Sequence, residues 1–208
     1  GRRGIRKGRN SMFNILSRVQ RKIHALSPEA KTYIIDFVKR VNSDLVGKVV
    51  NIASRCAGFL RKKFANTLSD HCEEPALVQS FIAAGDDIAA LYEAREFSRA
   101  MREIIALADQ ANQYIDEKKP WVLAKEPGKE NEVQAVCSVG INLFRALITY
   151  LKPVLPVMAE RSEAFLKISL DWHLLESPLL GHELDDFKPL LQRVDPDNVS
   201  AMVEGGKS

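Results

Sequence analysis

The sequence predicts an all-α protein, and three observations carry this prediction. Apolar residues recur every three or four positions through most of the 208 residues, which is the spacing of one face of a helix. Prolines stand where one such pattern ends or where the next begins. No internal repeat is present, so we expect the helices to form one bundle rather than a solenoid.

The positive charge of the chain is concentrated in its first 26 residues. This arm carries eight basic residues and no acidic one, so it has a charge of +8, whereas the whole chain has +3 and the remainder −5. Helical spacing within it predicts a short cationic amphipathic helix. Such an arm is consistent with a leader foreign to the natural domain, which we favour, with an arm that touches nucleic acid or membrane, or with a targeting peptide.

Residues 27–60 are expected to form two successive helices. Ser27 is a suitable N-cap, and Pro28 is tolerated at the first helical position. Asn42 and Ser43 then offer a break or a second cap. The apolar residues beyond them lie three or four positions apart: Leu45, Val49, Ile52, Ala53, Cys56 and Leu60.

On the second of these helices, Asn51 and Arg55 are four positions apart and therefore project from the same face. Together they supply a compact set of hydrogen-bond donors and acceptors that can read the edge of a nucleobase. Two ordinary polar residues facing water are the commoner reason for such a pair. The spacing alone does not separate the two interpretations.

A further helix is expected to begin at Pro75, and the next one begins near Glu96 and ends before Pro120. Proline has no N–H and disfavours the α conformation of the preceding residue, so Lys119 should leave the helix. Trp121 therefore lies at a bend and presents a large flat face. This placement suits stacking on an unpaired nucleobase, although a tryptophan that closes the core is commoner.

The C-terminal third begins with a turn signal at 126–128, after which a long helix with one buried face is expected over 133–151. Gly140 in this helix leaves room for a neighbouring helix to approach closely. Two prolines lead into another helix that continues to Leu166. Beyond it the composition suggests loops or a short hairpin, and Asp195-Pro196 predicts a short closing helix.

Neither a catalytic centre nor a metal site is predicted. The motifs of P-loop, dinucleotide-binding, serine-hydrolase and zinc-peptidase sites are absent, and carboxylate pairs such as Asp86-Asp87 are typical of a solvated surface. Cys56, Cys72 and Cys137 form no CxxC pair, which indicates core or inert thiols in a reducing compartment. No apolar run approaches the roughly 20 residues of a spanning helix, so we expect no association with a membrane.

Three stretches, taken together, resemble a known family: NSDLVGKVVNIASR at 42–55, REFSRAMREIIALADQANQYIDEKKPWVLAK at 95–125 and INLFRALITYLKPVLPVMAE at 141–160. They are similar to the anticodon-binding helical domain of bacterial methionyl-tRNA synthetase, a class I aminoacyl-tRNA synthetase. The segment LLGHELDDFKPLLQRVD at 179–195 resembles the hairpin and closing helix of that family. The resemblance runs from about residue 36 to the C-terminus.

The resemblance implies a class I synthetase anticodon-binding helix bundle whose partner is the anticodon loop of methionine tRNAs. It places the RNA-binding roles on Asn51, Arg55, Pro120 and Trp121. Trp121, held by Pro120, would stack on the first base of the CAU anticodon, and Asn51 and Arg55 would hydrogen-bond to anticodon bases. Stacking of this kind contributes about 1–3 kcal/mol per base.

The family's ATP-site signatures HIGH and KMSKS and its cysteine-bearing knuckle are absent from the sequence. We therefore expect an excised cytoplasmic domain that is inactive alone. Attachment of methionine to tRNA with ATP, and any zinc, would belong to the catalytic half of the parent, which is a second expected partner.

The expected organisation is a basic segment at 1–35, a helical bundle at 36–166 and an extension at 167–208 that would pack toward the catalytic half. Two alternatives stay open. One is a non-catalytic helical interaction scaffold with a basic arm. The other is the anticodon domain of another class I synthetase. The sequence does not determine the oligomeric state.

Overall fold

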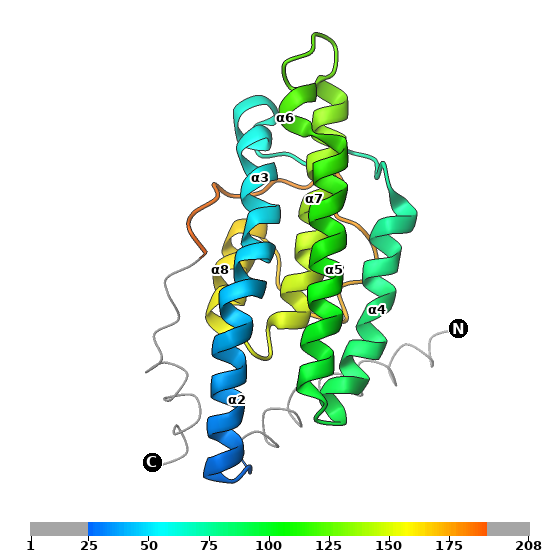
Figure 1. Ribbon diagram of the computed structural model, residues 1–208. Coiled ribbons are helices and arrows are strands. Elements are labelled where there is room, and N and C mark those ends of the chain that lie inside the picture. Colours follow the sequence, from blue (N-terminus) through cyan, green and yellow to red (C-terminus); the bar gives the residue numbers. More distant parts are fainter. Residues whose placement is uncertain (1–24, 191–208) are drawn as a thin grey trace, which may run out of the picture.

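The computed structural model describes residues 25–190, and these residues form the all-α bundle that the sequence predicts. Its helices are α2 (Pro28–Val41), α3 (Gly47–Phe64), α4 (Pro75–Glu93), α5 (Phe97–Lys118), α6 (Pro120–Leu123), α7 (Glu130–Leu151) and α8 (Pro156–Leu166). Residues 25–190 contain no strand. Figure 1 shows α2 and α3 end to end, with α6 at the same end of the bundle as the C-terminus of α3. The predicted amphipathic and closing helices lie outside the described residues.

Several helix boundaries fall where the sequence places them. The hydroxyl of Ser27 accepts a hydrogen bond from the N–H of Ala30 at 3.3 Å, and α2 begins at the following Pro28. Proline is likewise the first residue of α4 and of α8. Each of these prolines is the first residue of its helix, where an N–H group would have no hydrogen-bond partner within the helix.

The connection between α2 and α3 differs from the expected break or cap. A π-helical turn over Asn42–Val46 joins the two helices, and Figure 1 shows them as one continuous rod. A π turn widens the helix locally without interrupting the course of the chain. The two polar residues at 42 and 43 therefore mark a change of helical pitch rather than a terminus.

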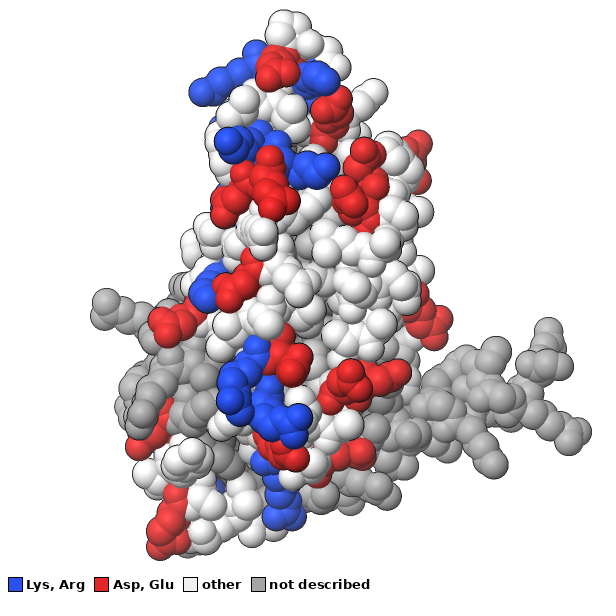
Figure 2. Space-filling model, turned by 45° about the vertical axis from the view of Figure 1, so that its right-hand side comes forward, with Lys and Arg blue, Asp and Glu red and all other residues white. Residues whose placement is uncertain are grey.

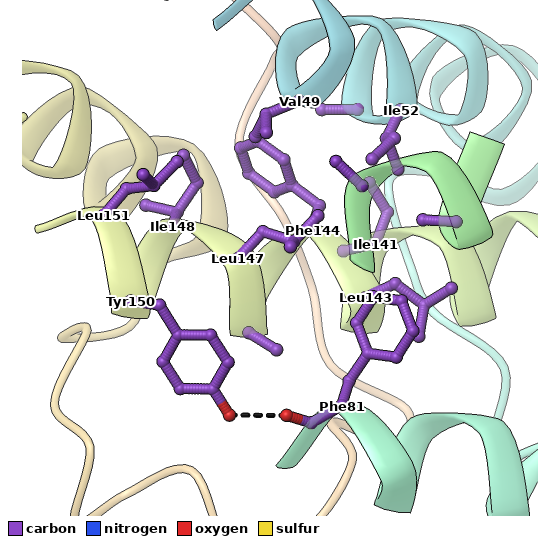
Figure 3. Packing of buried hydrophobic residues seen from close by; sticks show 14 of the residues in the cluster. Val49, Ile52, Phe81, Ile141, Leu143, Phe144, Leu147, Ile148, Tyr150 and Leu151 are labelled. Atoms are coloured by element: carbon purple, nitrogen blue, oxygen red, sulfur yellow. Dashed lines mark hydrogen bonds between the residues drawn. The ribbon is translucent and has the colours of Figure 1, made fainter. Parts of the chain in front are cut away.

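Helix α7 occupies the centre of the bundle. All its residues from Ala135 to Leu151 are buried. Figure 3 shows its Phe144 facing Val49 and its Ile141 facing Ile52 of α3, while the Tyr150 hydroxyl donates a hydrogen bond to the Phe81 carbonyl of α4. By length and composition α7 could cross a membrane, but 94% of the window that meets this criterion is buried inside the bundle. Its apolar character is accounted for by the core.

Gly140 allows α3 and α7 to approach closely, as its place in the sequence predicted. A Cβ at this position would lie 2.5 Å from the Cys56 sulfur and 3.5 Å from a methyl carbon of Ile115. Real side chains do not reach such a short distance without displacing a neighbour. Cys56 and Cys137 are buried and Cys72 is half-buried, all three as free thiols.

The tail after α8 forms no hairpin of its own within the described residues. Residues 181–184 instead run antiparallel to residues 66–69 of the α3–α4 connection. Backbone hydrogen bonds join Leu68 N to His182 O at 2.9 Å, Gly181 N to Ser69 O at 2.8 Å, and Leu184 N to Asn66 O at 2.8 Å. The extended segment therefore finds its backbone partners more than 100 residues earlier in the chain, which local patterns do not reveal.

Two buried polar residues of α7 hold the tail in place. Asn142 donates to the Leu179 carbonyl at 3.2 Å and accepts from the Leu179 N–H at 2.7 Å. Arg145 donates to the carbonyls of Ser177 at 2.9 Å and Leu174 at 2.7 Å. Burial lowers the pKa of the Arg145 guanidinium, and these hydrogen bonds replace those that it would make with water.

Candidate nucleic-acid interface

A row of polar contacts joins α3 to α5, which run parallel. Lys48 Nζ lies 2.7 Å from Asp109 Oδ1, Asn51 Nδ2 donates to Asn112 Oδ1 at 3.2 Å, and Arg55 Nη2 donates to Asp116 Oδ1. The three α3 residues and the three α5 residues share the same spacing of three and then four positions. We refer to the six residues Lys48, Asn51, Arg55, Asp109, Asn112 and Asp116 as the α3–α5 ladder.

Asn112 organises the middle of the ladder. Its amide nitrogen donates to the carbonyls of Lys48 at 3.1 Å and Ala108 at 3.0 Å. Its oxygen is thereby directed at α3, where it accepts from Asn51 and, at 3.4 Å, from Arg55 Nη1. Asn51 is exposed, and in residues 25–190 its own amide oxygen has no hydrogen-bond partner. An acceptor therefore remains available to a ligand.

The bend at Pro120 is formed as the sequence predicts. Helix α5 ends at Lys118, and Lys119 adopts a left-handed conformation with φ of 49°. Pro120 is buried and is the first residue of α6, so the proline both ends one helix and begins another. Trp121 follows it with 37% of its surface exposed. The indole is held at a fixed angle by a short rigid segment.

The guanidinium of Arg55 lies over the indole of Trp121, with its central carbon 4.8 Å from the ring centroid. This distance is typical of a cation–π contact. Asp116 and Asn112 hold the same guanidinium from the α5 side. The structure thus brings Arg55 against Trp121, with Asn51 one turn of α3 from Arg55, although about seventy positions separate the pair from the tryptophan in the sequence.

Sequence reasoning missed Asn112 and Asp116. They are four positions apart on α5, which is the same spacing that singled out Asn51 and Arg55 on α3. We interpreted carboxylates on helix surfaces as solvated, and Asp116 is indeed exposed over 63% of its side chain. Only the parallel packing of two helices converts the matching spacings into a set of contacts.

Charged side chains of both signs surround this end of the bundle. The last turn of α3 contains Arg61, Lys62 and Lys63, and that of α5 contains Lys118. Lys63 donates to the Ala124 carbonyl at 3.1 Å and so ties α3 to the end of α6. Figure 2 shows basic and acidic side chains interspersed at its upper end rather than one uniform basic face. Recognition of a ligand at this end would therefore depend on individual hydrogen bonds and ion pairs more than on a uniform positive potential.

A family model described as the anticodon binding domain of methionyl tRNA ligase matches residues 67–186, which is more than half of the chain. Asn112, Asp116, Pro120 and Trp121 lie inside the matched range, whereas the α3 half of the ladder lies before it.

Solved structures with a similar fold include the free state of Mycobacterium tuberculosis methionyl-tRNA synthetase, with a TM-score of 0.66 and 20% identity over 82% of this chain and 35% of that chain. The complex of the same enzyme with methionyl-adenylate gives a TM-score of 0.65 and 20% identity over 81% and 34%. At this identity the likeness concerns the fold. The chain spans about a third of the length of these structures.

Proposed function

The chain belongs to the family of anticodon-binding domains of methionyl-tRNA ligases, and from this premise we propose that it recognises the CAU anticodon loop of methionine tRNAs. The observation that supports this most directly is the cation–π contact between Arg55 and Trp121, one helical turn from Asn51. An exposed aromatic face and a hydrogen-bonding pair from a second helix are what an unstacked base requires.

In this proposal, the indole of Trp121 stacks on the first anticodon base, a cytosine. The buried Pro120 makes the backbone before Trp121 rigid, so less conformational freedom is lost when the indole binds a base. In the free chain Arg55 covers one face of the ring and competes for that surface. A base that stacks on the indole would displace the Arg55 guanidinium from the ring toward the hydrogen-bonding edge of that base.

Asn51 and Arg55 supply the hydrogen bonds that choose between bases. A cytosine edge carries both acceptors and an amino donor. The guanidinium can donate only, whereas the amide of Asn51 can donate and accept. The contacts from Asn112 and Asp116 restrict the positions of both side chains before RNA arrives. Preorganisation of this kind reduces the entropy cost of binding.

We further propose that the complete enzyme, of which this chain would be the tRNA-binding part, attaches methionine to its tRNA in the cytoplasm using ATP. ATP, and zinc where it is used, are assigned to the catalytic half. The tail that Asn142 and Arg145 hold against α7 is proposed to lead toward that half.

The test measures the affinity of the 208-residue chain for an RNA stem-loop with CAU in its loop. Trp121→Ala should weaken binding by about 1–3 kcal/mol, and Trp121→Phe should restore part of the loss because a stacking face returns. Helical circular dichroism should not change. The matched control is Val122→Ala, an exposed neighbour on α6 that should leave the affinity unaffected. Equal affinity of the wild type and Trp121→Ala would refute the proposal.

A deletion separates this proposal from a scaffold that holds RNA only through its basic arm. Removal of residues 1–24 should reduce the salt dependence of binding but preserve the preference for CAU over other loops. Loss of the preference together with the arm would favour the scaffold.

A further inference from the structure

The outer surface of α3 carries a glycine that no contact within the described residues requires. Gly58 is exposed in the middle of α3, and a Cβ built on it would meet no heavy atom within 4 Å. The helix glycines Gly85 and Gly140 differ, since a Cβ there would lie 2.9 Å from the Tyr150 hydroxyl and 2.5 Å from the Cys56 sulfur. Glycine inside a helix is less stable than alanine, so packing within the bundle does not explain Gly58.

Gly58 lies on the same face of α3 as the hydrogen-bonding pair. Asn51, Arg55, Gly58 and Lys62 follow one another at spacings of four, three and four, which places them along one side of a helix. Gly58 is thus one turn beyond Arg55 and one turn before Lys62. A ligand that contacts Asn51 and Arg55 and continues toward the C-terminus of α3 must pass over Gly58.

Cationic groups stand around this bare position. Lys62 is exposed and forms no hydrogen bond or ion pair with any other residue between 25 and 190. Arg61 is also exposed, and its only charged contact in that range is with Asp186, which is itself exposed, at 3.5 Å. The surface at Gly58 has no side chain to keep a ligand away from the helix, and cationic groups flank it. This combination suits a polyanion that lies close to the helix.

We propose that the sugar–phosphate backbone of the anticodon arm crosses α3 at Gly58, with its phosphates bound by Lys62 and Arg61. This inference rests on the proposed function and adds a second element to the same site. Asn51, Arg55 and Trp121 select the bases. The contact between the RNA backbone and Gly58 fixes the position of the RNA along α3. The absence of a Cβ lets the backbone approach close enough for both kinds of contact to form together.

The decisive variant is Gly58→Ala in the 208-residue chain, because its two expected effects have opposite signs. The melting temperature should rise by about 1–4 °C, since alanine favours the helix and has open space. The affinity for the CAU stem-loop should nevertheless fall by about three- to tenfold, since the methyl group separates α3 from the RNA backbone. Gly58→Gln should weaken binding further while the helix content stays the same.

Gly47→Ala is the matched control. Gly47 is exposed on α3, has no heavy atom within 4 Å of a built Cβ, and lies eleven residues from Gly58. Eleven residues are about three turns, so it shares the face of Gly58 at a distance of about 16 Å along the axis. It should gain a similar rise in melting temperature and keep the wild-type affinity.

Lys62→Gln tests the phosphate contact. It should lower the slope of log K against log salt by about 0.7–0.9 and weaken all loops equally, because a phosphate carries no sequence information. Unchanged affinity in Gly58→Ala, or an equal loss in Gly47→Ala, would overturn the inference. If Trp121→Ala still weakens CAU binding in that case, the proposed function stands without it. Loss in Gly58→Ala with none in Trp121→Ala keeps the backbone contact and rejects anticodon reading.

Discussion

The two sides of the bundle use polar side chains in opposite ways. On the α3–α5 side, Arg55 pairs with other side chains, and its partner Asp116 is 63% exposed. On the α7 side, Arg145 is 4% exposed and donates only to backbone carbonyls. A contact with an exposed partner side chain can be exchanged for a contact with a ligand at small cost, whereas the backbone hydrogen bonds of a buried guanidinium cannot. The contacts of Arg55 therefore suit recognition of a ligand, and those of Arg145 suit stabilisation of the fold.

Arg145→Met should have the largest effect on stability. It removes the donors from the Leu174 and Ser177 carbonyls and loosens the tail, so the free energy of unfolding should fall by about 2–4 kcal/mol. Arg55→Met, its counterpart on the other side, should cost less than about 1 kcal/mol. Urea unfolding of both variants checks the difference. Similar losses in the two would show that the contrast between the sides is wrong.

Gly140→Ala should destabilise the α7 side by about 1–3 kcal/mol, because its new Cβ would overlap the Cys56 sulfur. Cys56→Ala in the same chain removes that sulfur and should recover much of the loss. Thermal unfolding of the single and double variants measures this coupling. Additive losses would indicate that the sulfur is not what Gly140 accommodates.

Asp116→Asn should change RNA selectivity more than stability. The carboxylate that holds Arg55 loses its charge, so the guanidinium is less well positioned, and discrimination against a changed first anticodon base should fall by about 1 kcal/mol. Stem-loops that differ in that base provide the measurement. A uniform change in affinity for every loop would instead assign Asp116 a general electrostatic effect on RNA.

The first rung of the ladder should contribute little. Lys48 and Asp109 form an ion pair at 2.7 Å, but about half of each side chain is exposed. A double-mutant cycle with Lys48→Met and Asp109→Ala should yield a coupling energy of about 0.2–1 kcal/mol that decreases in high salt. A larger coupling that persists in salt would mean that the ladder stabilises the fold.

The smallest effect is expected at His71 in the α3–α4 connection. A hydrogen bond that the ring donates to the Asp70 carboxylate, assisted by one that it donates to Glu73, raises the pKa of the ring above its ordinary value. The folded state therefore binds the proton more tightly than the unfolded chain, so the stabilisation is present below the unfolded pKa and is lost as pH rises through the folded pKa. His71→Gln should lower stability slightly in acid and leave it unchanged in mild base. An NMR titration of the ring measures the shift directly, and a pKa at or below its ordinary value would contradict it.

The sequence predicted the parts of this molecule that depend on local chemistry. Ser27-Pro28 and Pro75 mark helix starts because capping and the missing N–H act within one turn, and Pro120 ends α5 for the same reason. Asn51 and Arg55 could be named as a pair because helical spacing alone puts them on one face.

What the sequence did not predict depends on contacts between distant segments. Asp116 was interpreted, like the other carboxylates on helix surfaces, as solvated, and Asn112 was not singled out, because their contacts form only where α5 packs parallel to α3. The tail at 181–184 looked suited to a hairpin, but the chain supplied a partner at 66–69. The π turn at 42–46 kept α2 and α3 continuous where two polar residues suggested an end.

The parallel course of α3 and α5 has an electrostatic consequence. Aligned peptide dipoles give the C-terminal end of each helix a partial negative charge of about half an electron, and both helices end near Trp121. Left alone, these two ends would repel a polyanion. The cationic side chains in the final turns, three on α3 and one on α5, offset that field. These four cations exceed the combined negative charge of the two helix ends, which is about one electron, so positive charge remains at this end for the phosphates of a bound RNA.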